Sequence, residues 1–414
     1  MSVLLADVGP FWLRLGLTDA DGEVVRLHHE FPGRGEPRLG ELYRAKVHAN
    51  EPRLGGVFCD LGGAQGFLPV KGHPPRVGDT ITVWIRREAI GAKACQLVAA
   101  PSLRLPGATV RWGDEGTLTV SAGPLPVPDE ASNVIREQAL VAGEAAFAEG
   151  PPGLAGGAPP LVRAATGLVS SDTSEVRASD ADAAATLRAW LEPLGLAVGL
   201  YDAAPIQAAL DEAEEDALRR TVGLPGGGAV TFDEAEALTA IDIDAGRRDA
   251  RSAKGAQEAV AATMLSVIGR QAALRSLGGQ IVLDLPRRAF ASPKVLRDRL
   301  TKALTPLGRV SVPAVTNEGV VVVIAPRAGP SLLERLTESD GDGVLPGRRL
   351  RDDALAASAC RVLARSLSED RAARRVLACP ARARPYVEDA APALMQRYGA
   401  RFEIVTQEGP PDVR

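Results

Sequence analysis

The stretches "ALTAIDIDAGR" (237–247) and "LGGQIVLDL" (277–285) decide the fold of this chain. Each is an apolar strand that ends on acidic side chains, Asp242 and Asp244 in the first and Asp284 in the second. The residues between the two strands have the periodicity of a helix and are followed by two glycines. A strand, a helix and a strand in this order predict a right-handed crossover that sets the strands parallel. The acids would then lie at one sheet edge, where their oxygens suit Mg²⁺.

Composition limits the classes to which the protein can belong. Its 414 residues predict several domains, and its net charge of −4 argues against bulk electrostatic binding of nucleic acid. Any RNA site would therefore be a local basic patch. The four cysteines are dispersed without a C-x-x-C pair, and no stretch is apolar enough to span a bilayer. We expect a cytoplasmic protein that is neither secreted nor membrane-spanning.

The rest of the chain alternates between strand-rich and helix-rich segments. Strands at the amino terminus predict an antiparallel meander, and short strands between 40 and 99 predict a small closed barrel of the OB-fold type. Residues 103–160 contain one helical stretch at 133–149 and little else that is periodic. The strand-like segments "LVRAAT" and "SEVRASD" and the helix "DAAATLRAWLEPLG" follow, and they can pack on the meander. The barrel would then be an insertion.

Three motifs give the chain a resemblance to the ribonuclease E/G family: "GELYRAKVHANEPRLGGVFCDLGGAQGFLPV" (40–70), "LPGGGAVTFDEAEALTAIDIDAGR" (224–247) and "LRSLGGQIVLDL" (274–285). The resemblance implies an α/β multidomain protein whose RNase H-like domain carries an inserted OB-fold barrel. The implied parts are an RNase H-like domain (1–40 and 161–220), an OB-fold RNA-binding domain (41–100), a reduced sensor or connecting region (101–160), a DNase I-like catalytic subdomain (221–338), and a hinge with a small C-terminal α/β domain (339–414).

The same resemblance assigns the catalytic and metal-binding residues. Asp242 and Asp284 match the two family aspartates that bind the catalytic Mg²⁺, and Asp244 matches a third metal-site position that is usually Asn. Alternation places Asp242 and Asp244 on one strand face and the flanking isoleucines on the other. On spacing alone, acids that mark a strand-end turn, with Asp284 in a loop, would be the simpler interpretation. The resemblance favours the metal site.

In the barrel, Phe58 and Phe67 match family positions that stack RNA bases, and Lys93 matches a basic position beside them. Such stacking contributes about 1–3 kcal/mol per base and tolerates any sequence. Taken alone, each phenylalanine is more typical of a barrel core, and Lys93 is an ordinary surface lysine. Basic residues outnumber acidic ones between 41 and 111, which suits contact with phosphates.

Several motifs of the family are altered. "TVSAG", with Val120 and Ser121, replaces the V-R-T-A-G motif that recognises a 5′-monophosphate, so this preference is not expected. Residues 339–349 contain no cysteine, so no zinc is expected and any homo-oligomer would not be zinc-linked. "DLPRRAF" lacks the usual second acid after Asp284, and the apolar run 320–324 predicts a buried strand.

Together these features predict a Mg²⁺-dependent endoribonuclease that cleaves single-stranded RNA in rRNA or mRNA processing or decay, with activity weakened by the altered motifs. The alternative is a non-catalytic RNA-binding protein of the same fold. The presence of both Asp242 and Asp284 favours the enzyme.

Overall fold

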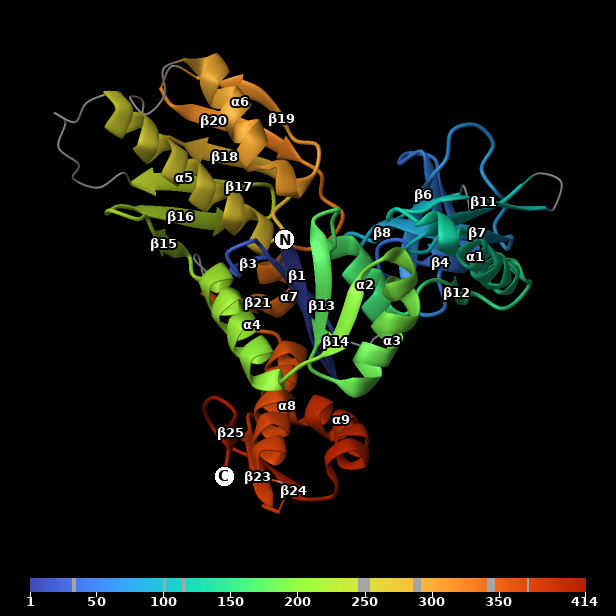
Figure 1. Cartoon of the computed structure of the whole chain (residues 1–414). Helices are drawn as coiled ribbons and strands as arrows, with labels where there is room; N and C mark the ends of the chain where they lie inside the picture. The colour runs from blue at the N-terminus through green and yellow to red at the C-terminus, as the bar shows by residue number, and fades with distance from the viewer. Residues whose placement is uncertain are drawn as a thin grey trace. The chain divides into compact units, whose positions relative to one another are not determined.

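The computed structural model describes residues 1–31, 35–99, 102–113, 117–244, 254–285, 292–316, 318–340, 347–370 and 372–414, without the side chains of 254–260. The chain forms two compact units. Unit 1 contains Met1–Leu15, His28–Ala208 and Glu334–Arg414, and unit 2 contains Gly16–Leu27 and Ala209–Leu333. Both units mix helices with strands (Figure 1), so the predicted α/β class is confirmed.

A five-stranded sheet joins the first strands of the chain to strands that follow residue 170. In spatial order its strands are β14 (Ala197–Leu200), β13 (Thr173–Ala178), β1 (Ser2–Gly9), β2 (Trp12–Thr18) and β3 (Val24–Glu30). β1 and β13 are parallel, with Leu4 beside Val176. The barrel lies in sequence between β3 and β13, so it is an insertion, as predicted.

Two helices, α2 (Pro160–Leu168) and α3 (Ala181–Leu191), share a core with this sheet, in which Leu187 and Leu4 are fully buried. The strand that "LVRAAT" predicted is wrong, because these residues form α2. Pro160 stands at the first position of the helix, where its missing N–H costs nothing, and the alanines that follow favour a helix.

The predicted barrel is present and closed. Its strands are β4 (Leu42–Glu51), β5 (Gly56–Asp60), β6 (Gln65–Pro69), β7 (Thr80–Arg87) and β8 (Cys95–Val98), in the order β4-β5-β6-β8-β7 with β7 paired back to β4. Tyr43, Val57 and Ile85 are among the side chains that fill the interior. This closed five-stranded arrangement fits an OB-fold.

Residues 102–156 form more structure than their composition predicted. Strands β9 (Ser102–Arg104), β10 (Ala108–Trp112) and β11 (Leu118–Ala122) make an antiparallel sheet, and α1 (Ser132–Phe147) contacts it. The helix matches the prediction, whereas the three strands were missed. A Cβ on Gly143 of α1 would lie 2.8 Å from Val110, so glycine permits the close approach of helix and sheet. A short strand, β12 (Gly153–Gly156), then pairs with β4 of the barrel.

Unit 2 contains a six-stranded sheet with helices against one face. The order is β15 (Thr221–Gly223), β16 (Ala229–Glu234), β17 (Thr239–Asp244), β18 (Gly279–Asp284), β20 (Val320–Ala325) and β19 (Ser311–Val315). Helices α5 (Lys254–Leu274) and α6 (Pro293–Ala303) bury Met264, Ile268 and Leu300 against it. The predicted hairpin, helix and strand around the acids are all present.

The C-terminal part of unit 1 is the small α/β region that the sequence predicted. Its elements are α7 (Leu332–Leu336, of which Glu334 onward lies in unit 1), β21 (Thr337–Asp340), β22 (Gly347–Leu350), α8 (Asp352–Glu369), β23 (Arg375–Cys379), α9 (Arg384–Tyr398), β24 (Phe402–Thr406) and β25 (Asp412–Val413). Helix α8, with Leu363 and Leu367 fully buried, was not predicted. Within the described ranges, no helix is long and apolar enough to cross a membrane.

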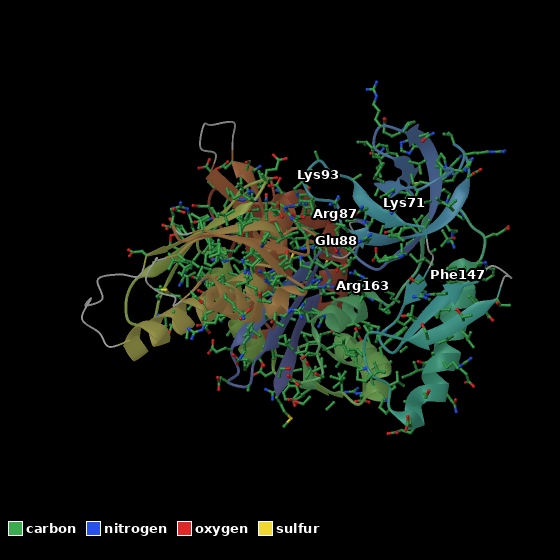
Figure 2. The ribbon with its side chains drawn as sticks, turned by 90° about the horizontal axis from the view of Figure 1, so that it is seen from above. Lys71, Arg87, Glu88, Lys93, Phe147 and Arg163 are labelled. Atoms are coloured by element: carbon green, nitrogen blue, oxygen red, sulfur yellow. The ribbon has the colours of Figure 1, made fainter. Side chains whose placement is uncertain are left out.

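A buried ionic cluster lies where the barrel is joined to the rest of unit 1 (Figure 2). Arg163 of α2 pairs with Glu30 of β3 at 2.7 Å, while Glu88, which follows β7, pairs with Arg335 at 2.8 Å and with Arg38 at 3.3 Å. Burial would raise the pKa of Glu30, but its hydrogen bond with His28 and the arginine charges outweigh burial and lower that pKa to about 2. The cluster therefore holds paired charges away from water.

We expect unit 1 to lose stability as the pH is lowered below about 6.5. His29 is 2% exposed, and burial, followed by the charge of Arg14, lowers its pKa well below 6.5. The unfolded chain then binds a proton that the folded protein rejects, so the free energy of unfolding decreases as the pH falls, by up to about 1.4 kcal/mol per pH unit for one group. Protonation of Glu30 in the unfolded chain adds a further loss between about pH 4.5 and 2.

Urea denaturation between pH 8 and 5 measures this dependence. In a His29→Gln variant, the free energy of unfolding should change less with pH than in wild type, whatever its value at pH 8. In His73→Gln, at an exposed histidine, the free energy of unfolding should change with pH as in wild type. An equal pH dependence of the free energy of unfolding in wild type and His29→Gln would contradict the role of His29.

Candidate functional site

The two acidic strands of unit 2 are direct neighbours. β17 and β18 pair in parallel, and Asp242 is the register partner of Asp284. Neighbouring strands lie about 4.8 Å apart, so the two backbones bring the carboxylates to the same place on the sheet. This confirms that the two strands are parallel and shows that they are adjacent rather than separated by another strand.

The carboxylates project from the face of the sheet opposite to the helix-covered core. Ile241 and Ile243 are buried, whereas Asp242 and Asp244 alternate with them and are exposed. Asp284 is also exposed and is the last residue of β18. It is therefore a strand residue, so its interpretation as a loop acid is wrong. The alternation places all three acids on one face.

The register neighbours of the aspartate pair are uncharged. Thr231 is the register partner of Asp242 on β16, and Val320 is the partner of Asp284 on β20. Among the residues that the structure describes, the side chains of Asp242 and Asp284 have no hydrogen-bond or ion-pair partner. Like charges side by side in a sheet repel each other unless a cation lies between them. The pair therefore fits Mg²⁺, which one or two carboxylates hold together with water.

Asp244 occupies a different position from the pair. It lies two residues beyond Asp242 on β17, past the last register pair with β18. Within the described ranges, no three His, Cys, Asp or Glu side chains are grouped closely enough to hold a metal ion. The structure thus brings Asp242 and Asp284 together and leaves Asp244 as their neighbour along the strand. The altered motif "DLPRRAF" lies, after Leu285, outside the described residues.

The strand after the acids is buried on one side only, which corrects the prediction for 320–324. Val321 and Val323 are fully buried, but Val320 and Val322 are half-buried and Ile324 is 38% exposed. An apolar run predicts burial on both faces, yet α5 and α6 contribute to a core on one face. The aspartates consequently share their face with partly exposed apolar side chains.

On the barrel, Phe58 and Phe67 lie outside the core. They are register partners on β5 and β6, their ring centroids are 5.2 Å apart, and both are half-buried. The interior is filled instead by their neighbours Val57, Cys59 and Leu68. The barrel-core alternative is therefore wrong for both phenylalanines, and they form an aromatic pair at the barrel surface.

Lys93 is exposed between β7 and β8, where its backbone bridges to that of Ile90. Figure 2 labels Lys93 on the barrel, together with Arg87 and Lys71. Gln96, three residues after Lys93, is the register partner of Phe67. The strand β8 thus connects the region of Lys93 to the aromatic pair.

Two polar residues beside the aromatic pair were missed by sequence reasoning. The ring of His48 on β4 lies 6.3 Å from that of Phe58, and Gln65 contacts the His48 ring. Both are exposed. The alternation of Lys46 and His48 with buried residues in "AKVHA" was the signal that could have placed His48 on the outer face.

The altered sensor motif lies on β11. Val120 pairs with Val110 and packs against the core of residues 102–156, and the Ser121 hydroxyl donates to the Thr109 carbonyl oxygen. Both side chains are uncharged, and both make their contacts within the small sheet and its core. A 5′-phosphate would need a cation, which neither side chain supplies, and the Ser121 hydroxyl already donates its proton to Thr109.

All four cysteines are buried thiols. Burial raises the pKa of Cys59 and Cys95 to about 11 and that of Cys360 to about 12. None of them lies in residues 339–349.

Comparisons with known proteins identify related sequences. The family model described as "Ribonuclease E/G family" matches residues 130–321, which include Asp242 and Asp284 but not the barrel. Ribonuclease E of Haemophilus influenzae is 35% identical over 127 residues, which cover 29% of this chain and 13% of that protein. Ribonuclease E of Escherichia coli is 35% identical over 127 residues, 29% of this chain and 12% of that protein. The aligned segment spans only about an eighth of either relative.

Proposed function

We propose that this chain, which matches the ribonuclease E/G family over residues 130–321, is an endoribonuclease that uses Mg²⁺ at Asp242 and Asp284 to cleave single-stranded RNA. The observation that carries the proposal is the register pairing of the two aspartates on adjacent parallel strands. Its family relatives named ribonuclease E support RNA as the substrate.

The side chains of this site have separable tasks. Asp242 and Asp284 would hold the ion, and Asp244 would accept a hydrogen bond from water next to it. A Mg²⁺ ion held there would supply a water of lowered pKa and positive charge to offset the negative charge that develops on the phosphate. The buried isoleucines behind the pair fix the backbone of β17, so the carboxylates are held in place before the ion arrives.

The barrel supplies RNA binding in this proposal. Phe58 and Phe67 present their rings at the surface for stacking with bases, and Lys93 contacts a phosphate. Because stacking does not depend on base identity, it suits the processing or decay of rRNA and mRNA in the cytoplasm. Recognition of a 5′-monophosphate and a zinc-linked oligomer are not part of the proposal.

The resemblance to the family also suggests which family domain each part of the chain corresponds to. We assign the sheet of β1–β3, β13 and β14 to the RNase H-like domain and the barrel to its OB-fold insertion. The six-stranded sheet of unit 2 then corresponds to the DNase I-like subdomain. The parallel pairing of β1 with β13 on either side of the insertion supports this layout.

Removal of the metal tests the proposal. The purified chain should cleave an end-labelled single-stranded RNA in Mg²⁺, lose cleavage in EDTA, and recover it when Mg²⁺ is restored. A fully double-stranded RNA of the same length is the matched control and should stay intact. RNA that is bound but uncut at every Mg²⁺ concentration would contradict the enzyme and support the non-catalytic RNA-binding alternative.

A further inference from the structure

A row of side chains crosses four strands of the barrel surface. In register, Phe58 of β5 faces Phe67 of β6, and Phe67 faces Gln96 of β8. At the other end, the pairing of β4 with β5 is interrupted between Val47 and Ala49, so His48 is the extra residue of a β-bulge. Bulges redirect a side chain, and here the His48 ring is 6.3 Å from the Phe58 ring at an interplanar angle of 35°. The two phenylalanines are thus extended by a third ring.

A hydrogen bond restrains the imidazole of His48. The Nε2 atoms of Gln65 and His48 are 3.1 Å apart. An amide nitrogen can only donate, so Nε2 of His48 accepts and its ring proton is on Nδ1. Gln65 keeps a second N–H and a carbonyl oxygen, which together suit the edge of a nucleobase.

The charges nearby favour a base over a phosphate at this position. Asp60 is the register partner of Gln65 and also of Lys46, and it accepts hydrogen bonds from the backbone N–H groups of Gly62 and Gly63. These bonds lower the pKa of Asp60. The ionised carboxylate of Asp60, next to Gln65 in the sheet, repels phosphate, whereas an uncharged base is not repelled.

We propose that His48 and Gln65 form a base-recognition position at the end of the Phe58–Phe67 pair, where the imidazole stacks with a third base of a single-stranded RNA and the amide of Gln65 binds the polar edge of that base. Histidine rings stack with unpaired bases in RNA complexes, and amide side chains read their Watson–Crick edges. The inference rests on the proposed function, because it requires RNA on the barrel. It adds selectivity to a surface that stacking alone would leave indifferent to sequence.

Fluorescence anisotropy with short RNA homopolymers of equal length tests the position. His48→Ala should weaken binding of every homopolymer by about tenfold, and His48→Phe should restore most of that affinity because it restores the ring. Gln65→Ala should lower the ratio between the tightest and the weakest homopolymer by about fivefold, with a smaller change in mean affinity. His73→Ala, at an exposed histidine in the loop after β6, is the matched control and should bind like wild type.

The outcomes separate this inference from the proposed function. Thermal melting first establishes that each variant is folded. If Phe67→Ala weakens binding while His48→Ala and Gln65→Ala behave like wild type, the base-recognition position is overturned and the RNA-binding surface stands. If Phe67→Ala also binds like wild type, RNA binding by the barrel itself fails. Loss of affinity in His48→Ala that His48→Phe does not restore would overturn the stacking role of the imidazole.

Discussion

Replacement of Asp242 or Asp284 by asparagine is expected to lower the rate of RNA cleavage by about 10³-fold or more while RNA binding is unchanged. Asparagine keeps the shape of the side chain and removes its charge. The register pair then offers one carboxylate to the ion instead of two. Because the exposed pair has no basic partner among the described residues, loss of the charge should not destabilise the sheet. The measurement is the initial rate of cleavage of an end-labelled RNA at saturating Mg²⁺.

Two further variants define the site. Glu236→Gln changes an exposed acid in the turn at the opposite end of β17 and should retain wild-type activity. Asp244→Asn should reduce the rate less than Asp242→Asn, because Asp244 lies beyond the register pair and the family position is usually Asn. Full activity in both Asp242→Asn and Asp284→Asn would refute the assignment of the metal site.

Replacement of Asp7 by alanine is expected to cost about 3–5 kcal/mol of stability in the five-stranded sheet. Asp7 and Arg14 are each 1% exposed, and the Asp7 carboxylate accepts bonds of 3.0 and 2.8 Å from Arg14. Gln207 of α4 (Ala203–Leu218) donates to the same carboxylate at 3.1 Å, and its own oxygen accepts a bond from Arg365 of α8. Removal of Asp7 leaves the Arg14 charge buried without this carboxylate. A buried charge that has lost its partner lowers the free energy of unfolding.

Native-state hydrogen exchange of the β1 and β2 amides measures this loss locally, without assuming that the whole chain unfolds in one step. The double variant Asp7→Leu with Arg14→Met removes both charges and should be less destabilised than Asp7→Ala. Glu192→Ala breaks the exposed pair with Arg188 and should cost about 0.5 kcal/mol or less. An Asp7→Ala variant as stable as Glu192→Ala would show that the buried pair contributes little.

The sequence predicted the parts of the fold in which local pattern and tertiary structure agree. Alternating burial in "AIDID" and a helix that ends before two glycines specified the crossover, and this placed Asp242 beside Asp284. The strands β9–β11 were missed because they are short, separated by Gly and Pro, and stabilised by contacts with α1 that are distant in sequence. Helix α8 was missed although most of its faces are buried.

The candidate RNA surface shows a different limit of prediction from the sequence. In "GVFCD", Val57, Phe58 and Cys59 are all apolar, so composition could not tell which of them point into the barrel. The position of His48 depends on a bulge, and a bulge is a property of how two strands pair rather than of either strand alone. The family resemblance identified the phenylalanines, but only the register of the barrel identified their neighbours.

The insertion of the barrel between β3 and β13 has a consequence for synthesis on the ribosome. Ser2 and Thr173, which bond to each other, are 171 positions apart. At about 5–20 residues per second, β1 waits roughly ten to thirty seconds before its parallel partner is made. The barrel is complete much earlier and can fold as a unit while the strands that precede it remain unpaired with β13. The nascent chain thus carries an unpaired sheet edge until residue 178 has been made, which makes this segment the expected target of chaperones that protect unpaired strands.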